Sequence, residues 1–259
     1  MPFFKEELRL FLTALQFFTR VPVPAWTGWS AAQLSQSSRY FPLVGIFVGA
    51  VAGGVFEGAR LLWPPTIAVL LSMVASVLLT GAFHEDGFAD SCDGFGGGVE
   101  RAQVLAITKD SRVGSYAVVG LVLLLAIKFQ ALLAFATLGT LPPGRFVLIS
   151  VAAHAVSRCS VLWVMARLPY VRDDADSKSK PIAVGIGRAA LVFATVVAAL
   201  AAAGLGWTGM PAFLAAALVA SGSVRYLRRR LGGYIGDALG ATQQVAEAVF
   251  LLAVLVCVK

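Results

Sequence analysis

Seven long apolar segments, separated by short polar connections, constrain the fold of this chain more than any other feature. They cover residues 41–60, 61–83, 116–138, 146–166, 189–206, 209–224 and 243–258. A run of roughly 20 apolar residues is long enough for a helix to cross the hydrocarbon core of a bilayer. Only 14% of the 259 residues are charged, whereas soluble domains have about a quarter. The sequence therefore predicts an all-α fold, a polytopic transmembrane helical bundle with about seven membrane segments.

The segments differ in length, and the chain ahead of them has another pattern. Residues 209–224 and 243–258 are short for a span, so we expect them to tilt, to lie partly in the interface or to extend into flanking sequence. No polar connection is long enough for a further domain, so residues 1–259 are predicted to form a single integral-membrane domain. One face of the N-terminal stretch predicts an amphipathic helix that lies along the membrane interface. Its apolar residues are Leu8, Phe11, Leu12, Leu15 and Phe18.

Basic residues are distributed unevenly between the two sides of this predicted bundle. If the N-terminus lies inside, most of the 21 Lys and Arg residues fall in the inner regions, around residues 5–39, 101–112, 167–188 and 225–230. Cytoplasmic loops of membrane proteins carry such an excess of positive charge. We therefore predict a multi-pass protein of the cytoplasmic (inner) membrane whose polar loops face the cytoplasm. The net charge of +7 then reflects contact with the lipid bilayer, and nucleic acid is not an expected partner.

The polar connection between residues 84 and 115 carries six of the 14 acidic residues of the chain. Asp86, Asp90 and Asp93, here called the aspartate stripe, are spaced i, i+4 and i+7, so a helix would place them on one face. Adjacent carboxylates raise one another's pKa unless a cation neutralises them. Hard oxygen ligands suit Mg²⁺ or Mn²⁺, and Mg²⁺ is the cofactor we expect. The alternatives are a solvated acidic loop and a calcium site, although the EF-hand ligand order is lacking.

Residues that suit a phosphate group accompany the stripe. Gly94 follows its last aspartate, and a bare backbone there lets a phosphate approach. The tetrapeptide Lys109-Asp110-Ser111-Arg112 adds two cations and a hydroxyl that neutralise phosphate oxygens. Juxtamembrane anchoring is the alternative interpretation of these basic residues. Together the stripe and the tetrapeptide predict metal-assisted attack on a phosphoanhydride.

Five stretches of the chain look like one known family. The most specific are AFHEDGFADSCDGFGGG (residues 82–98) and KDSRVGSY (residues 109–116). The stretches RYFPLVGIFVG, GGYIGDALGAT and FFTRVPVP agree as well, so the match runs from the first twenty residues to the last predicted helix. These motifs resemble the cobalamin synthase family, adenosylcobinamide-GDP ribazoletransferase. Glu85 stands where the family usually has a leucine-like residue, and its side chain leaves the aspartate stripe.

The resemblance implies the final step of cobalamin biosynthesis, carried out in the cytoplasmic membrane. A hydroxyl of α-ribazole, or of its 5′-phosphate, would displace GMP from adenosylcobinamide-GDP with the assistance of Mg²⁺. The aspartate stripe would hold one or two metal ions against the pyrophosphate, and Lys109 and Arg112 would meet the charge on the leaving group. Asp110, or a stripe carboxylate such as Asp93, would accept the proton of the attacking hydroxyl. Other corrinoid-assembly enzymes and further copies of this chain are candidate partners.

Five polar residues outside the stripe and the tetrapeptide are further candidates for a functional role. Asp237, near the start of the last helix, either caps that helix or contacts a second metal or the ribazole. His84 either orients a carboxylate or phosphate or is a structural histidine. His154 and Arg158 are spaced i and i+4 inside a span, and Arg158 is expected to bind substrate phosphate or to pair with an acidic residue of the last helix. Lys128, also mid-span, is expected to snorkel or to join this polar interior.

Two other functions stay open at the level of sequence. A CDP-alcohol phosphotransferase also begins its motif with D-x-x-D-G, which residues 90–94 match, but the later residues of that motif are lacking. Release of GMP rather than CMP separates the two enzymes. A transporter would use His154, Arg158 and Lys128 as a relay, but the acidic residues crowd one interface rather than the midplane. The sequence does not fix the general base, the number of metal ions, the preferred acceptor or the oligomeric state.

Overall fold

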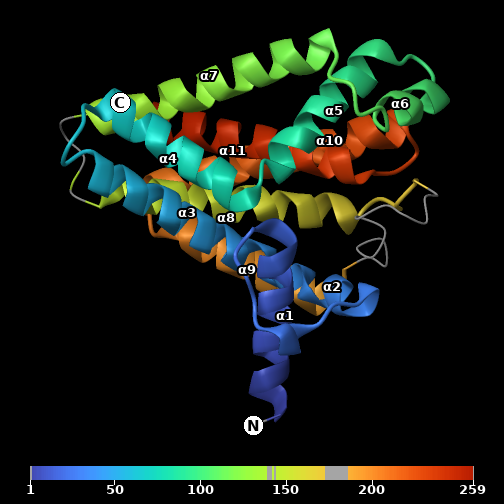
Figure 1. Cartoon of the computed structure of the whole chain (residues 1–259), viewed down its shortest axis with the longest axis horizontal. Coiled ribbons are helices and arrows are strands. Elements are labelled where there is room, and N and C mark those ends of the chain that lie inside the picture. The colour runs from blue at the N-terminus through green and yellow to red at the C-terminus, as the bar shows by residue number, and fades with distance from the viewer. Residues whose placement is uncertain (1, 139–141, 143, 173–185, 259) are drawn as a thin grey trace.

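Helices that run back and forth along one axis form the bundle (Figure 1). The computed structural model describes residues 2–138, 142, 144–172 and 186–258. Apart from one isolated bridge between Tyr170 and Tyr234, all regular structure in these ranges is helical. Each predicted apolar segment coincides with a helix: α3 (Phe41–Ala59), α4 (Pro65–Thr80), α7 (Ser115–Thr137), α8 (Arg145–Met165), α9 (Arg188–Ala203), α10 (Gly209–Arg230) and α11 (Gly236–Val258). The predicted helical membrane fold is therefore confirmed.

The number of helices that are long and apolar enough to cross a membrane is smaller than the sequence suggested. Within the described residues, five helices are long and apolar enough to cross a membrane, namely α3, α7, α8, α10 and α11. A sixth results if α4 is counted together with α5 (Phe83–Gly97), from which it is bent by 88°. Helix α9 has only 16 residues. The count of about seven membrane segments is thus not confirmed, although α10 and α11 do extend into flanking sequence as expected.

Helix α8 forms the centre of the bundle, and α3 packs directly on it. Nearly every residue of α8 from Ala152 onward is buried. Gly45, Gly49 and Gly53 of α3 follow one another at intervals of four, so they share one face. A Cβ atom on Gly49 would lie 2.5 Å from the Ser150 carbonyl oxygen of α8. The absence of side chains on this face lets the two backbones touch, which is how many membrane helices pack.

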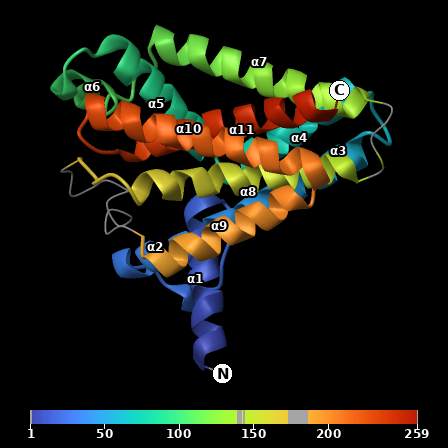
Figure 2. The same ribbon diagram turned by 180° about the vertical axis from the view of Figure 1, so that it is seen from behind.

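Helix α1 (Pro2–Phe18) lies across the bundle rather than along it (Figures 1 and 2). Its buried residues include Leu10, Leu15 and Phe18, whereas Leu8 is 40% exposed. The face that packs on the protein is therefore rotated relative to the predicted apolar face, which included Leu8. The short elements η1 (Ala25–Thr27), α2 (Ala31–Ser37) and η2 (Ser38–Tyr40) connect α1 to α3. This crosswise orientation is the one expected of a helix in the membrane interface.

The polar elements gather at the end of the bundle opposite the C-terminus (Figure 1). Helix α5 reaches this end after a sharp bend, in which Gly81 and Ala82 have φ angles of 66° and 59°. Glycine adopts such left-handed angles readily, whereas alanine does so at a cost. Helix α6 (Arg101–Ile107), the end of α10 and the start of α11 complete this polar end. Neither α5 nor α6 is by itself among the helices able to span a membrane.

Candidate active site

The site is built where α5 crosses α11 at two glycines. A Cβ atom on Gly87 of α5 would lie 3.0 Å from the carbonyl oxygen of Asp237 and 3.4 Å from the Cα of Gly240, both in α11. The two backbones can approach this closely only because both positions lack a side chain. As a result, Asp86 and Asp90 of α5 lie beside Asp237 at the start of α11, close enough to repel one another.

The charge of Asp90 is the clearest electrostatic feature of this crossing. Burial, followed by the nearby carboxylates of Asp237 and Asp86, raises the pKa of its carboxyl to about 6, while Arg172 opposes the shift. Arg172 lies in the segment after α8, and its Nη1 is 3.0 Å from Oδ2 of Asp237. One arginine thus faces three carboxylates, which leaves excess negative charge that favours a bound cation.

Asp93, the third member of the stripe, is used differently. Its Oδ2 accepts a hydrogen bond of 2.6 Å from the backbone N–H of Gly114, and its Oδ1 accepts one of 2.9 Å from that of Ala117. These N–H groups belong to the first turn of α7, where an acidic side chain satisfies unpaired donors and interacts favourably with the helix dipole. Asp93 therefore ties α5 to α7, while the other two stripe residues turn toward α11.

These carboxylates suit a hard cation that is shared with a substrate. Among the described residues, no three His, Cys, Asp or Glu side chains converge closely enough to hold a metal ion by themselves. Magnesium in proteins is usually held by one or two carboxylates together with water and substrate phosphates, rather than by a closed protein cage. Asp86, Asp90 and Asp237 offer only oxygen ligands, and the pKa of Asp90 is raised first by burial and then by the charges of Asp237 and Asp86. The residues present therefore fit Mg²⁺ bound together with a phosphorylated ligand.

The four residues of the predicted phosphate tetrapeptide have different surroundings. Arg112 is 88% exposed in its side chain and pairs with Asp110, whose Oδ1 and Oδ2 lie 2.9 and 3.0 Å from its Nε. Hydrogen bonds from Arg112 lower the pKa of Asp110 to about 2, which makes this carboxylate a weak proton acceptor at neutral pH. Ser111 is exposed. Lys109 lines a groove next to Arg172.

Gly94 and Arg172 both meet Thr108 at the end of α6. The side of Gly94 on which a Cβ would project is occupied by the methyl group of Thr108, so the bare backbone predicted to admit phosphate admits α6 there. Arg172 donates a hydrogen bond of 2.7 Å from Nη2 to Oγ1 of Thr108. The analysis of the sequence did not single out Arg172 as a site residue. Its only signal was a position on the same predicted side of the membrane as the stripe.

His84 points away from the stripe. It is 3% exposed, and its ring stacks on Phe18 of α1 with centroids 5.3 Å apart and an interplanar angle of 14°. Phe83 contacts the same imidazole edge-on. The structure therefore places His84 in the junction between α1 and α5, which favours the structural interpretation of this histidine.

Comparison with known proteins identifies the family. A family model described as cobalamin-5-phosphate synthase matches residues 10–255. The chain belongs to this family. The adenosylcobinamide-GDP ribazoletransferase of Leptothrix cholodnii is 47% identical, with 93% of each chain covered. The proteins of the same name from Shewanella amazonensis and Shewanella pealeana are 43% and 42% identical, and at least 98% of each chain is covered. No solved structure matches.

Membership of the cobalamin-5-phosphate synthase family confirms the resemblance drawn from the motifs. It favours that family over the CDP-alcohol phosphotransferases, whose motif this chain matched only at residues 90–94. The site of this family member has two parts among the described residues: carboxylates where α5 crosses α11, and cations from the chain around α6 and after α8. Lys178 and Lys180, which the sequence placed on the same side, lie outside the described residues.

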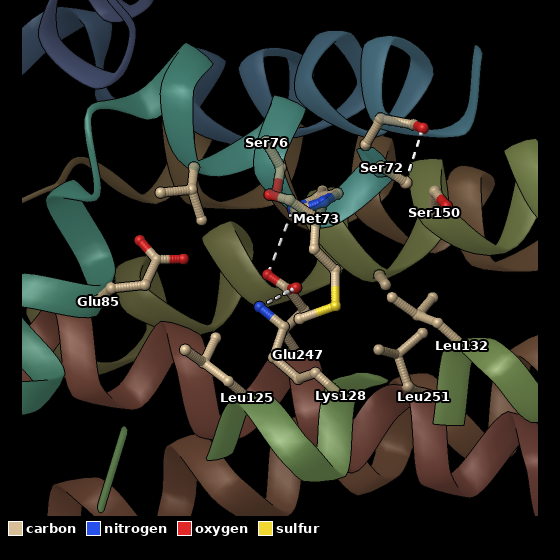
Figure 3. A pocket seen from close by; sticks show the side chains of 14 residues that line it. Ser72, Met73, Ser76, Glu85, Leu125, Lys128, Leu132, Ser150, Glu247 and Leu251 are labelled. Carbon is tan, nitrogen blue, oxygen red and sulfur yellow. Dashed lines mark hydrogen bonds and ion pairs between the residues drawn. The ribbon is translucent and has the colours of Figure 1, made fainter. Parts of the chain in front are cut away.

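A second polar cluster lies inside the bundle of this family member, around Lys128 and Glu247 (Figure 3). Lys128 of α7 pairs with Glu247 of α11, with Nζ 2.5 Å from Oε1, and Nδ1 of His154 lies 3.2 Å from Oε2 of the same carboxylate. Lys128 also donates to Gln244, and Gln244 donates in turn to Glu85 of α5 at 2.9 Å. Of the two expectations for Lys128, the structure therefore agrees with a place in the polar interior rather than with snorkelling. The side chain of Glu85 lies away from the stripe, as predicted.

Arg158 belongs to this interior cluster rather than to the stripe. It is 2% exposed, and its Nη1 lies 3.2 Å from Nδ1 of His154. Glu247 and Asp237, the two candidate partners in the last helix, are separated: Glu247 stays in the interior cluster, and Asp237 pairs with Arg172. Of the residues that a transporter would use as a relay, Lys128 and His154 therefore contact Glu247, and Arg158 contacts His154. This arrangement favours a structural tie between α7, α8 and α11.

Proposed function

We propose that this protein is a membrane transferase that joins α-ribazole, or its 5′-phosphate, to adenosylcobinamide-GDP and releases GMP, the final step of cobalamin biosynthesis. A hydroxyl oxygen of the ribazole forms the new P–O bond, the P–O bond of the phosphoanhydride to the GMP breaks, and the hydroxyl proton is released. The observation that carries this proposal is the crossing of α5 and α11, which sets Asp86 and Asp90 beside Asp237 in a chain that matches the cobalamin-5-phosphate synthase family.

The carboxylates and cations of the site have complementary roles in this proposal. Asp86 and Asp90, with Asp237 beside them, would hold Mg²⁺, which when bound neutralises and polarises the phosphoanhydride. Lys109 and Arg112 stabilise the negative charge that develops on the departing GMP. Arg172 holds Asp237 in place through its 3.0 Å ion pair. A stripe carboxylate is a better proton acceptor than Asp110, because Arg112 holds the pKa of Asp110 at about 2.

The membrane setting of the site also belongs to the proposal. The connections at the polar end of the bundle carry many basic residues, among them those of residues 101–112, 167–172 and 225–230. Such an excess of Lys and Arg is typical of cytoplasmic loops. The proposal therefore places the site at the cytoplasmic face of the inner membrane. There both water-soluble substrates reach the carboxylates without crossing the lipid bilayer.

The test is GMP release by the purified protein in detergent. We expect GMP in amounts equal to the joined product when adenosylcobinamide-GDP, α-ribazole and Mg²⁺ are all present, and none after chelation of the metal. Release of CMP from a CDP-alcohol, without GMP release, would support the phosphotransferase alternative instead. Uptake of a corrinoid into vesicles without any nucleotide release would support a transporter and would refute the proposal.

A further inference from the structure

A groove at the polar end of the bundle is lined by cations from two separate elements. It has a volume of about 530 Å³ and runs between α6 and the segment that follows α8. Arg101 and Lys109 lie at the two ends of the α6 side, and Arg172 lies on the opposite side. No acidic residue lines the groove within the part of the chain that the structure describes. Arg172 pairs with Asp237, and Arg101 and Lys109 add further positive charge to the hollow, which attracts an anion.

The floor between these cations is apolar. Ala102 and Leu105 of α6 and Val171 of the facing segment contribute small or aliphatic side chains to it. A ligand that matches both features has a flat apolar ring and a phosphate, because the ring covers the aliphatic floor while the phosphate meets the cations. A nucleoside monophosphate has this combination.

Arg172 joins this groove to Asp237, which lies beside Asp86 and Asp90 of the stripe. Its Nη1 lies 3.0 Å from Asp237, and its Nη2 is 2.7 Å from Oγ1 of Thr108. Its Nε is buried and has no hydrogen-bond partner among the described residues. A ligand in the groove would thus be separated from Asp237, one of the carboxylates proposed to hold the metal, only by the side chain of Arg172.

We propose that this groove is the subsite for a nucleoside monophosphate group of the reaction, with Arg101 as a residue that recognises its phosphate. The inference rests on the proposed function, which supplies two sources of this chemistry: the 5′-phosphate of the ribazole acceptor and the guanylate of the donor. Arg101 contacts a bound group rather than the reacting atoms, so its loss weakens binding more than it slows the chemical step.

The variant Arg101→Gln tests the subsite, with Arg101→Lys to restore the charge. A second variant, Ala102→Asp, adds a negative charge to the groove floor at an exposed position. The control is Arg225→Gln, which removes an exposed arginine of α10 that does not line the groove. For each purified protein the KM for α-ribazole 5′-phosphate, for α-ribazole and for adenosylcobinamide-GDP is measured, together with inhibition by GMP and the melting temperature.

The outcomes separate the two sources. If the groove holds the acceptor phosphate, Arg101→Gln raises the KM for α-ribazole 5′-phosphate about tenfold and leaves that for α-ribazole unchanged. If it holds the guanylate, the variant raises the KM for adenosylcobinamide-GDP and weakens inhibition by GMP with either acceptor. Unchanged constants in both Arg101→Gln and Ala102→Asp, with wild-type GMP release intact, would overturn the subsite alone. Absence of GMP from the wild-type reaction would overturn the proposed function and this inference with it.

Discussion

Asp90 and Asp93 lie one helical turn apart, yet their carboxylates face different surroundings. The pKa of Asp90 is raised from 3.8 to about 6, first by burial and then by Asp237 and Asp86. A raised pKa means that the protonated carboxyl stabilises the folded protein fully below about pH 3.8, and that this contribution is lost as the pH rises through about 6. At neutral pH without metal, the ionised Asp90 therefore destabilises the fold.

The variant Asp90→Asn tests this assignment. We expect GMP release to fall by about two orders of magnitude, because a metal ligand is lost. The melting temperature at pH 7.5 without metal should stay the same or rise, because an unfavourable charge is removed. Adding Mg²⁺ should raise the melting temperature of the wild type more than that of the variant. A clear loss of stability in Asp90→Asn without metal would contradict the assignment.

The variant Asp93→Ala is the matched contrast in the same helix. Removal of a side chain that caps α7 should cost about 1 kcal/mol of stability, so its melting temperature should fall without metal as well as with it. Equal behaviour of the two variants would show that the three stripe aspartates act alike, contrary to the contacts of Asp93 with Gly114 and Ala117.

The stripe could be predicted at this scale because its spacing is a local property of one helix. The division of labour within it could not, because the capping role of Asp93 depends on how the start of α7 packs against α5. Arg172 was missed for the same reason: its link to Asp237 joins residues 65 positions apart. The basic tetrapeptide was predicted as a unit, and its Asp110–Arg112 pair accounts for part of its charge.

At the scale of helices, the close packing of α3 on α8 depends on a glycine face. A Cβ atom on Gly49 would lie 2.5 Å from the Ser150 carbonyl oxygen and 2.6 Å from the Cα of Val151, so Gly49→Ala must push the two backbones apart. Gly54, on the same helix, has nothing within 4 Å of its Cβ position. The apolar periodicity predicted α3 to within one residue of its ends, but it did not show which glycines face another helix.

The pair of variants Gly49→Ala and Gly54→Ala separates packing from helix propensity. Gly54→Ala should leave the melting temperature unchanged or raise it slightly, because alanine is the better helix former by up to about 1 kcal/mol. Gly49→Ala should lower the melting temperature and the yield of monodisperse protein in detergent. If both variants melt alike, direct backbone packing of α3 on α8 is not what holds this interface together.

For the molecule as a whole, polar groups occur at two depths: the stripe at one end, and the cluster around Glu247 inside the bundle. The sequence predicted a polar interior around His154 and Arg158, and it left open whether Lys128 would snorkel or join that interior. It named Glu247 and Asp237 as candidate partners but could not choose between them, because that choice depends on the register of α7 and α8 against α11. Through Gln244 and Glu85, this cluster also holds the start of α5, the helix that carries the stripe.

Removal of charges from this cluster singly and together tests how it stabilises the bundle. Glu247→Gln leaves Lys128 charged and without its carboxylate in a site where both side chains are nearly fully buried. Loss of one partner of a buried pair typically costs about 3 kcal/mol or more, whereas replacing both with neutral groups costs less. The double variant Lys128→Met/Glu247→Gln should therefore melt higher than Glu247→Gln alone, and Lys5→Met, at an exposed position of α1, should have little effect. If the double variant is no more stable than the single one, the attraction between Lys128 and Glu247 is not what ties these helices together.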